Sequence, residues 1–428
     1  MSMKVLVVGR YGGEHALAWK LHQSAKVSKI YIAPGNAGTV TIGENIPITS
    51  AEDIISWLKI NKVDLVLIGS ASYLADGLAD KIQQLKLPVF GPTKAAAQIE
   101  WSKSFAKKFM REEGIPTAAF EIFSDIGQAR QYVKNKRFPL VIKADGLAFG
   151  LGTVIVKNLE EAELALYDLM VKKIFGRAGE IVIIEEFLEG EEISVHAFCD
   201  GENAELFPAS QDHKRLLDGD KGPNTGGLGV IAPVPGLSDK LLTEIRGQVI
   251  LPIMKELKKL GKPFLGVMYP GIMITKNGWR VLEVNVRFGD PEAQCYMRLL
   301  KTDLYEIIVA CIGGKLDKVK IEWESGSACC VVLAAAGYPS ENYKIGVPVF
   351  GLERLTKNNH TLLFYSNIKR NNNQLVTSGP RVISVSSTGL TLKEAINRAY
   401  QGIDKIHFDG MYYRKDIGEK ALLRLKPI

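Results

Sequence analysis

Short apolar segments alternate with helix-like segments along the first hundred residues of the chain. The apolar segments are consecutive runs, which are typical of strands, whereas the segments between them have the spacing of helices. Strands separated by helices predict a parallel, doubly wound α/β sheet. We expect strands at 4–8, 29–33, 65–68 and 88–90, and helices at 12–23 and 51–60.

The rest of the chain predicts two further regions of mixed structure. A long helix is expected at 94–113, because Thr93 can cap its start and Gly114 stops it. Residues 208–229 are polar and rich in glycine, so we expect a long mobile loop there. From about residue 327 onward the pattern indicates a third, α+β domain. Further strands are expected at 140–143, 153–156, 181–185 and 328–335, and further helices at 160–173, 238–260 and 392–406.

The charge balance of the chain is only mildly basic. Lys and Arg number 54 against 47 Asp and Glu, and the basic residues form only short runs such as 107–108 and 172–173. A nucleic-acid-binding protein would gather its charge into blocks, so no nucleic-acid partner is expected. The excess indicates either ordinary basic surface or a basic pocket for phosphorylated small molecules.

Cysteine usage and apolar run length bear on the location of the protein. The five cysteines are odd in number and form no C-x-x-C pair, so neither a disulfide framework nor a zinc site is indicated. No apolar run approaches the length of about 18 residues that a membrane span needs, and the run at 5–8 is too short for a signal peptide. We expect a cytoplasmic protein without a membrane partner.

A glycine-rich turn follows the first predicted strand. Gly9, Gly12 and Gly13 precede a helix start, where free backbone N–H groups attract phosphate. A dinucleotide site would need a glycine where Tyr11 stands and a carboxylate after the next strand, which ends without one at 33–35. The segment therefore disfavours NAD binding and leaves a phosphate site or a plain tight turn.

Two segments of the middle region suit a nucleoside triphosphate. Lys143 ends an apolar strand and precedes a glycine-rich loop at 144–152, which can fold over phosphates, although the chain has no G-x-x-x-x-G-K-[ST] motif. The acidic turn at 185–192 can offer its backbone to an adenine edge and a glutamate to ribose hydroxyls. An exposed lysine before a surface hairpin and a solvated acidic turn are the alternatives.

The strand expected at 281–288 carries the most informative polar pattern. Alternate residues share one face of a strand, which places Glu283, Asn285 and Arg287 together. A carboxylate and an amide oxygen suit a hard cation such as Mg²⁺, and an arginine can clamp a phosphate. An amphipathic strand facing water is the alternative, but it need not end in the Gly-Asp-Pro-Glu sequence of 289–292.

The loop at 210–229 mixes both signs of charge with amides and five glycines. Its composition suits a lid that closes over an anionic substrate, or else a disordered loop. His213 has no second His or Cys near it in the sequence, so no metal role is expected. Together the segments predict a nucleoside triphosphate enzyme without a P-loop.

Five segments in this order resemble the phosphoribosylamine–glycine ligase family of ATP-grasp enzymes. They read GPTKAAAQIEWSK, IKADGLAFGLG, IEEFLEGEE, SQDHKR followed by DGDKGPNTGGLG, and VLEVNVRFGDPEAQ. The resemblance extends over essentially the whole chain. It implies a parallel N-terminal domain at 1–103 similar to that of biotin carboxylase, an ATP-grasp unit at 104–325 with a lid at 122–190, and a small α+β domain at 326–428.

The resemblance also implies contacts to ATP and its metal. Glu283 and Asn285 would hold Mg²⁺ or Mn²⁺. The implied nucleotide contacts are Lys103 and Lys143 at the phosphates or adenine, Gly150 and Gly152 in the loop above them, Glu185, Glu186, Phe187 and Leu188 at the adenine, and Glu191 at the ribose.

Catalytic and substrate contacts are implied in the same way. Arg287 would meet the transferring phosphate, and Asp212 and Lys214 would complete the catalytic set. The residues implied near the substrates are Gly12, Gly13, Glu14, Pro34, Gly35, Asn36, Asp212, Asn224, Thr225, Gly226, Asp290 and Pro291.

The implied reaction is the ATP-dependent ligation of glycine to 5-phosphoribosylamine through a glycyl phosphate, in purine biosynthesis, by a monomer or homodimer. Another ATP-grasp carboxylate–amine ligase and a non-catalytic protein of the same fold are the alternatives. The first is motivated by Tyr11, Ala71 and Leu151, which stand where the family usually has glycine, glutamate and lysine. Arg10 is a hypothetical substitute for the arginine that the family has where Gly13 stands.

Overall fold

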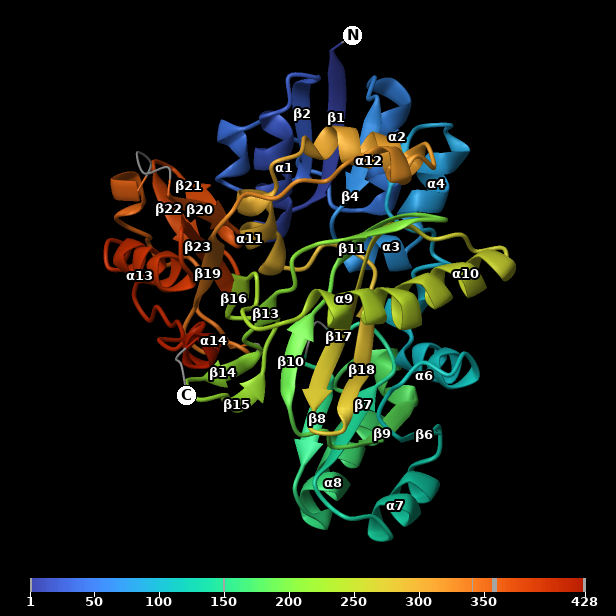
Figure 1. The fold of residues 1–428 in the computed structure, drawn as a ribbon. Helices are drawn as coiled ribbons and strands as arrows, with labels where there is room; N and C mark the ends of the chain where they lie inside the picture. The colour runs from blue at the N-terminus through green and yellow to red at the C-terminus, as the bar shows by residue number, and fades with distance from the viewer. Residues whose placement is uncertain (1, 149–150, 341, 356–359, 426–428) are drawn as a thin grey trace.

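The computed structural model describes residues 2–148, 151–340, 342–355 and 360–425. Figure 1 shows the N-terminal sheet at the top, a separate four-stranded sheet at the bottom and the C-terminal sheet at the left, with a central sheet between them. The expected fold class is confirmed: a parallel N-terminal sheet, a central unit made of two sheets, and a C-terminal α+β part. Within the described residues, no helix combines the length and apolar character that crossing a membrane requires.

The N-terminal sheet has the order β3-β2-β1-β4-β5, and all of its strands run parallel as expected. Gly9 ends the central strand β1 with a φ of +148°, and a Cβ there would lie 2.2 Å from Cγ of Glu14. Only glycine therefore lets the chain turn into the first helix. The elements are β1 (Met3–Gly9), α1 (Gly12–His22), β2 (Val27–Pro34), β3 (Glu44–Asn45), α2 (Ala51–Ile60), β4 (Leu65–Ile68), α3 (Ala71–Ala75), α4 (Leu78–Gln84) and β5 (Val89–Phe90).

The single helix expected at 94–113 is wrong. The chain breaks between α5 (Gln98–Trp101) and α6 (Lys103–Glu112), because Ser102 is extended at φ −119° and ψ 102°. Its hydroxyl caps α6 and also donates to the Asp145 carboxylate at 3.3 Å, across 43 positions of sequence. Helical periodicity cannot reveal a partner that far along the chain.

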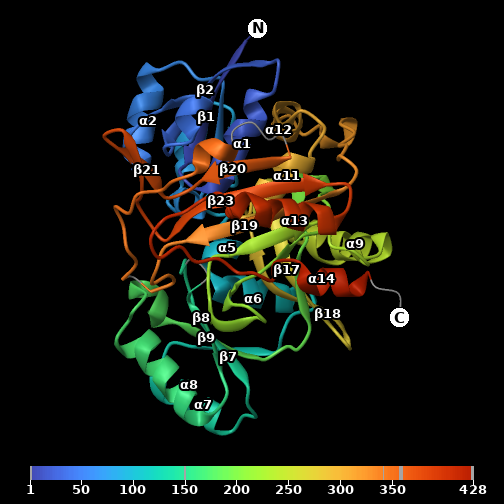
Figure 2. The same ribbon diagram turned by 90° about the vertical axis from the view of Figure 1, so that its left-hand side faces the viewer.

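The second sheet is antiparallel, in the order β6-β9-β7-β8, and two helices pack on one of its faces (Figure 2). Strand alternation sends Leu140 and Ile142 into the core beneath these helices, and Val141 and Lys143 to the opposite face. Its elements are β6 (Phe120–Phe123), α7 (Ile126–Lys134), β7 (Leu140–Ala144), β8 (Thr153–Val156), α8 (Leu159–Leu166) and β9 (Val182–Glu186).

The central sheet is built on the long strand β17, which pairs antiparallel with β10, β11 and β18. β18 ends at Asn285, so the expectation that strand alternation extends to Arg287 is wrong. The helix expected at 238–260 is helical from Asp239 to Lys259, with a π-helical turn at Arg246–Ile250. The elements are β10 (Glu191–Ser194), β11 (Ala197–Asp200), β12 (Ala204–Leu206), α9 (Asp239–Ile245), α10 (Leu251–Lys259), β17 (Leu265–Thr275) and β18 (Gly278–Asn285).

The C-terminal sheet takes two of its strands from the middle of the chain. Its order is β13-β16-β19-β23-β20, and β13 and β16 lie within or directly after the segment expected to be a long mobile loop. That loop prediction is wrong, since 208–229 also contains a two-stranded hairpin, β14 with β15. Buried polar groups of its backbone are paired in strands, which glycine content alone does not disclose. The strands are β13 (Gln211–Asp212), β14 (Arg215–Leu217), β15 (Lys221–Asn224), β16 (Gly229–Ala232), β19 (Ser327–Ala334), β20 (Thr361–Tyr365), β21 (Ile368–Asn371), β22 (Gln374–Thr377) and β23 (Arg381–Gly389).

Four further α-helices pack between or onto these parts of the described structure. α11 (Glu292–Leu299) and α12 (Leu304–Ile312) share one hydrophobic core with β1 and α1, so the central region is packed onto the N-terminal sheet. α13 (Leu392–Ile403) covers the C-terminal sheet, and α14 (Glu419–Arg424) lies near the end of the chain. This packing brings residues of four sheets, or of the turns that follow their strands, to one cavity.

Candidate functional site

A cavity of about 740 Å³ is lined by residues from all three parts of the molecule. Tyr11 and Glu14 come from the N-terminal sheet region, Lys143 and Glu283 from the two central sheets, and Arg381 from the C-terminal sheet. The cavity is of the size that protein sites for small molecules usually have. It therefore contains most of the residues that the sequence singled out.

One carboxylate faces two lysines on the cavity wall formed by the second sheet. Oε2 of Glu185 lies 2.9 Å from Nζ of Lys143 and 3.1 Å from Nζ of Lys107, and all three side chains are buried. Burial lowers the pKa of Lys107 to about 8, although Glu185 acts in the opposite direction. We call Lys107, Lys143 and Glu185 the two-lysine cluster. Lys107 was not singled out from the sequence, where it is one of a pair of lysines on a helix.

A third lysine stands beside this cluster at the start of α6. Nζ of Lys103 donates to the carbonyl of Gly146 at 2.8 Å, and burial, together with the charge of Lys143, lowers its pKa. The Asp145 carboxylate accepts from the backbone N–H of Ser104 at 3.0 Å. The glycine-rich loop is thus tied to α6, and Gly152 of that loop lines the cavity.

The acidic turn after β9 also borders the cavity. Glu186, Phe187 and Leu188 all line it, and Oε1 of Glu186 accepts from the N–H of Ala119 at 2.9 Å. Glu191 lines it as well and forms an ion pair with Arg424 of α14. The apolar side chains of Phe187 and Leu188 can accommodate a flat ring. Gly150, which was expected here too, lies outside the described residues.

The inverse arrangement occurs on the central sheet, where one lysine faces two carboxylates. Nζ of Lys214 lies 2.5 Å from Oε1 of Glu192 and 3.1 Å from Oε1 of Glu283. Burial would lower the pKa of Lys214, but the two carboxylates raise it well above its usual value. In turn, Lys214 holds the pKa of Glu283 far below its usual range despite burial. We call Lys214, Glu192 and Glu283 the two-glutamate cluster.

Glu283 and Asn285 follow each other on the cavity side of β18, as expected from their spacing. Both side chains offer hard oxygen atoms, and Glu283 is ionised because Lys214 lowers its pKa. Among the residues described, no three His, Cys, Asp or Glu side chains gather into a metal site. The pair therefore fits a cation such as Mg²⁺, which takes its other ligands from phosphate oxygens and water.

Arg287 lies just beyond β18 and keeps its place through other contacts. Its Nε lies 3.1 Å from Oε1 of Glu100, and its guanidinium lies 5.7 Å from the ring centre of Tyr269. Burial acts against the charge of Arg287, but Tyr269 and Glu100 outweigh it and raise the pKa. The guanidinium is therefore a fixed positive charge on the cavity wall.

Asp212 and Glu14 are cavity carboxylates that form no ion pair with a lysine among the described residues. Burial, followed by the charge of Glu292, raises the pKa of Asp212 well above its usual value, and Oδ1 of Asp212 has no hydrogen-bond partner within the part of the chain that the structure describes. Burial likewise raises the pKa of Glu14 to about 7, with a further contribution from Asp290. Raised carboxyl pKa values in a cleft are typical of groups that exchange protons.

Arg381 of the C-terminal sheet is a cavity residue that the sequence did not disclose. Its Nη2 lies 2.9 Å from Oδ2 of Asp290, and its Nη1 donates to the carbonyl of Gly226 at 2.7 Å. The adjacent Gly227 has a φ of +99°, and a Cβ there would lie 2.7 Å from Pro291. The only local signal is its place at the start of a strand after a Gly-Pro pair. Asn224, Thr225 and Gly226 line the cavity beside it.

Five residues expected near the substrates do not line the cavity: Gly12, Pro34, Gly35, Asn36 and Pro291. The N–H of Gly12 donates to Oγ of Ser366 at 2.8 Å, and Nδ2 of Asn36 donates to the carbonyl of Tyr365 at 2.7 Å. Gly12 and Asn36 thus pack the N-terminal part against the C-terminal part. Arg10 is exposed and also absent from the lining, whereas Gly13 and Glu14 belong to it.

Three family models match consecutive parts of the chain. The models describe the N domain, the ATP-grasp (A) domain and the C domain of phosphoribosylglycinamide synthetase, and they match residues 3–100, 101–293 and 328–420. A phosphoribosylamine–glycine ligase of Caldanaerobacter subterraneus is 45% identical over 417 residues, which cover 97% of this chain and 99% of the relative.

Solved structures have the same architecture. A phosphoribosylamine–glycine ligase from Thermotoga maritima superposes with a TM-score of 0.83 at 34% identity, covering 97% of this chain and 100% of that one. The biotin carboxylase domain of a Hydrogenobacter thermophilus 2-oxoglutarate carboxylase, solved with MgADP, has a TM-score of 0.72 at 15% identity, covering 96% of this chain and 92% of the other. At that identity the likeness concerns the fold alone.

Proposed function

The chain belongs to the phosphoribosylglycinamide synthetase family, and on that premise we propose that it ligates glycine to 5-phosphoribosylamine with ATP. The observation that carries the proposal is the cavity shared by four sheets, with the two-lysine cluster and the two-glutamate cluster on its walls. A ligase of this kind must hold a triphosphate, a carboxylate and an amine in one enclosed space. The relatives named above share nearly the full length of the chain.

We assign the nucleotide to the space between the second sheet and the central sheet. Lys103, Lys107 and Lys143 supply positive charge for phosphate oxygens, and the turn at Glu186–Leu188 supplies apolar side chains and backbone for the adenine. Glu191 is the candidate for the ribose hydroxyls. We assign Gly152, which lines the same cavity, to the phosphate end of the nucleotide.

Glu283 and Asn285 are the proposed ligands of a divalent cation, Mg²⁺ or Mn²⁺. A cation held there would withdraw charge from the transferring phosphoryl group when ATP is bound. Lys214 and Arg287 add fixed positive charge on the same wall and stabilise the same developing charge. Charge neutralisation and alignment provide most of the catalysis in phosphoryl transfer.

The order of chemical steps follows from the reactants. A carboxylate is a poor electrophile, so the glycine carboxylate first attacks the γ-phosphorus of ATP and releases ADP. The amine of 5-phosphoribosylamine then attacks the carbonyl carbon of the glycyl phosphate, and inorganic phosphate leaves. The attacking nitrogen must lose a proton, and Asp212, whose pKa is raised by burial, is the candidate base.

The proposal is tested by phosphate release from ATP with glycine and 5-phosphoribosylamine, compared with other amino acids and other amines. Phosphate release that needs both named substrates supports it, with glycinamide ribonucleotide identified by mass spectrometry. Equal or faster release with another acid or amine would replace it by a different ATP-grasp ligase. No transfer from ATP with any pair would leave a non-catalytic protein of this fold. A monomer or homodimer in the cytoplasm stays a prediction.

A further inference from the structure

The hairpin of β14 and β15 is a small element, and the pairing of its two strands alone stabilises it little. It belongs to no larger sheet, and its side chains are mostly half-buried or exposed. An isolated two-stranded hairpin is only marginally stable in water. Its base nevertheless carries Asp212 and Lys214 on one side and Asn224 and Thr225 on the other, all of which line the cavity.

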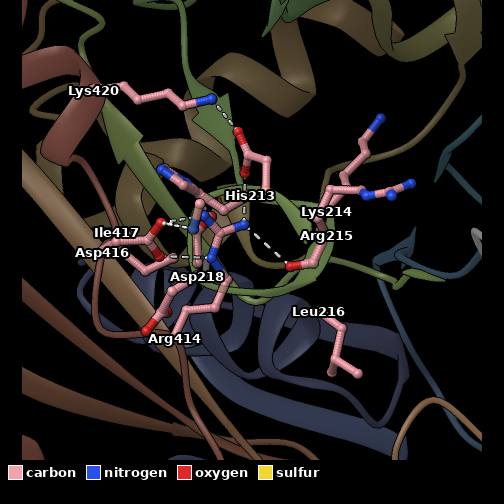
Figure 3. Close-up of polar contacts among 12 residues, drawn as sticks. His213, Lys214, Arg215, Leu216, Asp218, Arg414, Asp416, Ile417 and Lys420 are labelled. Atoms are coloured by element: carbon pink, nitrogen blue, oxygen red, sulfur yellow. Dashed lines mark hydrogen bonds and ion pairs between the residues drawn. The ribbon is translucent and has the colours of Figure 1, made fainter. Parts of the chain in front are cut away.

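Arg414, a buried arginine in the C-terminal part of the chain, binds this hairpin on the side away from Lys214 (Figure 3). Arg414 is fully buried, and its guanidinium binds both oxygens of Asp416, at 2.8 and 2.7 Å. Its Nη1 also donates to Oδ1 of Asp220 at 2.8 Å and to the carbonyl of Arg215 at 3.1 Å. One guanidinium thus contacts both the first residue of β14 and the turn that leads into β15.

The tip of the hairpin is held by the same group of residues. Asp220 takes a φ of +54°, which is unfavourable for a residue with a side chain, and its carboxylate is bound by Arg414 and Lys420. The N–H of Gly219 donates to Asp416 at 2.8 Å, and the N–H of Lys415 donates to Asp218 at 2.8 Å. Burial acts against the charge of Asp416, but hydrogen bonds from Arg414 lower its pKa to about 2, so the pair is ionised at neutral pH.

A second contact fixes the base of the hairpin beside Lys214. Nε2 of His213 accepts from the N–H of Gly418 at 3.1 Å, while its Nδ1 faces the carbonyl of Gly229 at 3.1 Å. Burial lowers the pKa of His213 to about 4, so the ring is neutral and can accept this bond. The segment 414–418 is itself held by the hydroxyl of Tyr400, which donates to the carbonyl of Arg414 at 2.8 Å and accepts from the N–H of Ile417 at 3.1 Å.

We propose that Arg414 is a positioning residue that holds the β14–β15 hairpin so that Lys214 reaches Glu192 and Glu283 in the cavity. The backbone of Arg215, which Arg414 binds, directly follows Lys214, and the carbonyl of Lys214 accepts from the N–H of Thr225 at 2.7 Å. Movement of the hairpin therefore moves the ammonium group. The proposal rests on the proposed function, because Lys214 is assigned to the phosphoryl-transfer end of the site.

The test compares Arg414→Lys and Asp220→Asn with Arg398→Lys, all in the full chain. Arg414→Lys keeps the charge but cannot bind Asp416, Asp220 and the Arg215 carbonyl at once. Arg398 is a matched control, since it belongs to the same part of the molecule and pairs with Glu394 on α13, away from the hairpin. Asp220→Asn weakens the ion pairs with Arg414 and Lys420 without altering a buried side chain.

We expect kcat of glycine-dependent phosphate release to fall about 10- to 100-fold in both test variants, because small displacements of a positioned group cost that much. KM for ATP should change less than about 3-fold, since the two-lysine cluster does not contact the hairpin. Hydrogen–deuterium exchange should rise in peptides covering 213–225 and stay unchanged in those covering β1 and β4. Arg398→Lys should match the unsubstituted chain in every measurement.

A kcat within about 2-fold of that control in both variants would overturn the proposal. So would an exchange increase that is equal throughout the chain, because that indicates general loss of stability. If the unsubstituted chain releases no phosphate with these substrates, the proposed function fails. Hydrogen–deuterium exchange then still shows whether Arg414 holds the hairpin in place. Unchanged hydrogen–deuterium exchange of 213–225 in Arg414→Lys would refute the proposal that Arg414 holds the hairpin.

Discussion

The two charged clusters of the cavity have opposite composition. In the two-lysine cluster, one oxygen of Glu185 faces the ammonium groups of Lys107 and Lys143. In the two-glutamate cluster, the ammonium group of Lys214 faces the carboxylates of Glu192 and Glu283. Counted by their members, the first has one excess positive charge and the second one excess negative charge.

Because of this difference in net charge, the two walls of the cavity suit different ligands. Excess positive charge suits the phosphate oxygens of a nucleotide, whereas excess negative charge suits a divalent cation. The clusters also differ in burial: side chains of the first are 2–9% exposed, and those of the second 27–35%. A substitution in the two-lysine cluster should therefore lower the free energy of unfolding. A substitution in the two-glutamate cluster should change the metal requirement and the catalytic rate.

The largest expected effect comes from making the same substitution in each cluster. Glu185→Gln leaves two buried ammonium groups without a counter-charge and should lower the free energy of unfolding by about 3–5 kcal/mol. Glu192→Gln, at a half-exposed ion pair, should cost at most about 1 kcal/mol. Urea unfolding followed by tryptophan fluorescence measures both. Equal losses in the two variants would contradict the contrast in burial.

The second prediction concerns the metal. Glu283→Gln should lower kcat about 100-fold and raise the concentration of Mg²⁺ or Mn²⁺ needed for half-maximal rate, because it removes the charged oxygen ligand. Glu192→Gln is the control that loses the same ion-pair partner, Lys214, but no proposed ligand. Chelation by EDTA should abolish activity in all forms. A metal dependence shared by both variants would remove Glu283 from the metal site.

The smallest effect concerns Glu14, a cavity carboxylate without a paired lysine. Its pKa is raised to about 7, chiefly by burial, against an ordinary value of 4.5. The ionised form is therefore disfavoured in the folded state, and stability present below pH 4.5 is lost as pH rises through about 7.

Glu14→Gln should remove this loss. The free energy of unfolding of the variant, relative to the unsubstituted chain, should rise between pH 5 and pH 8 by about 1–3 kcal/mol. Thermal unfolding across this pH range measures it, with Glu44→Gln as control, since the Glu44 side chain is 54% exposed. A pH-independent difference between Glu14→Gln and the unsubstituted chain would show that Glu14 does not titrate in this range.

Much of the fold follows from local patterns. The helix at 51–60 and the strands at 65–68 and 153–156 are confirmed to the residue, because each combines a clear periodicity with a local stop signal. The helix at 94–113 and the loop at 208–229 were wrong. In both, a partner far along the chain decides the structure: Asp145 for Ser102, and β19 for β16.

The same division holds for the cavity. The spacing of Glu283 and Asn285 and the position of Lys143 at a strand end could be predicted, since strand alternation determines a side chain's face. Lys107 and Arg381 could not, because nothing local separates them from other basic residues on a helix or strand. Gly12 and Asn36 were expected near the substrates, but they pack the N-terminal part of the molecule against the C-terminal part.

By itself, the sequence determined the succession of strands and helices, the family resemblance and the kinds of charged group available to the site. Tertiary structure alone decided which charges meet. Lys143 and Glu185 are 42 positions apart, Lys214 and Glu283 are 69, and Arg414 and Asp220 are 194. Periodicity and capping act over a few residues, whereas burial and Coulomb interactions depend on distance in space. Only the packing of the four sheets could therefore bring these charged pairs together.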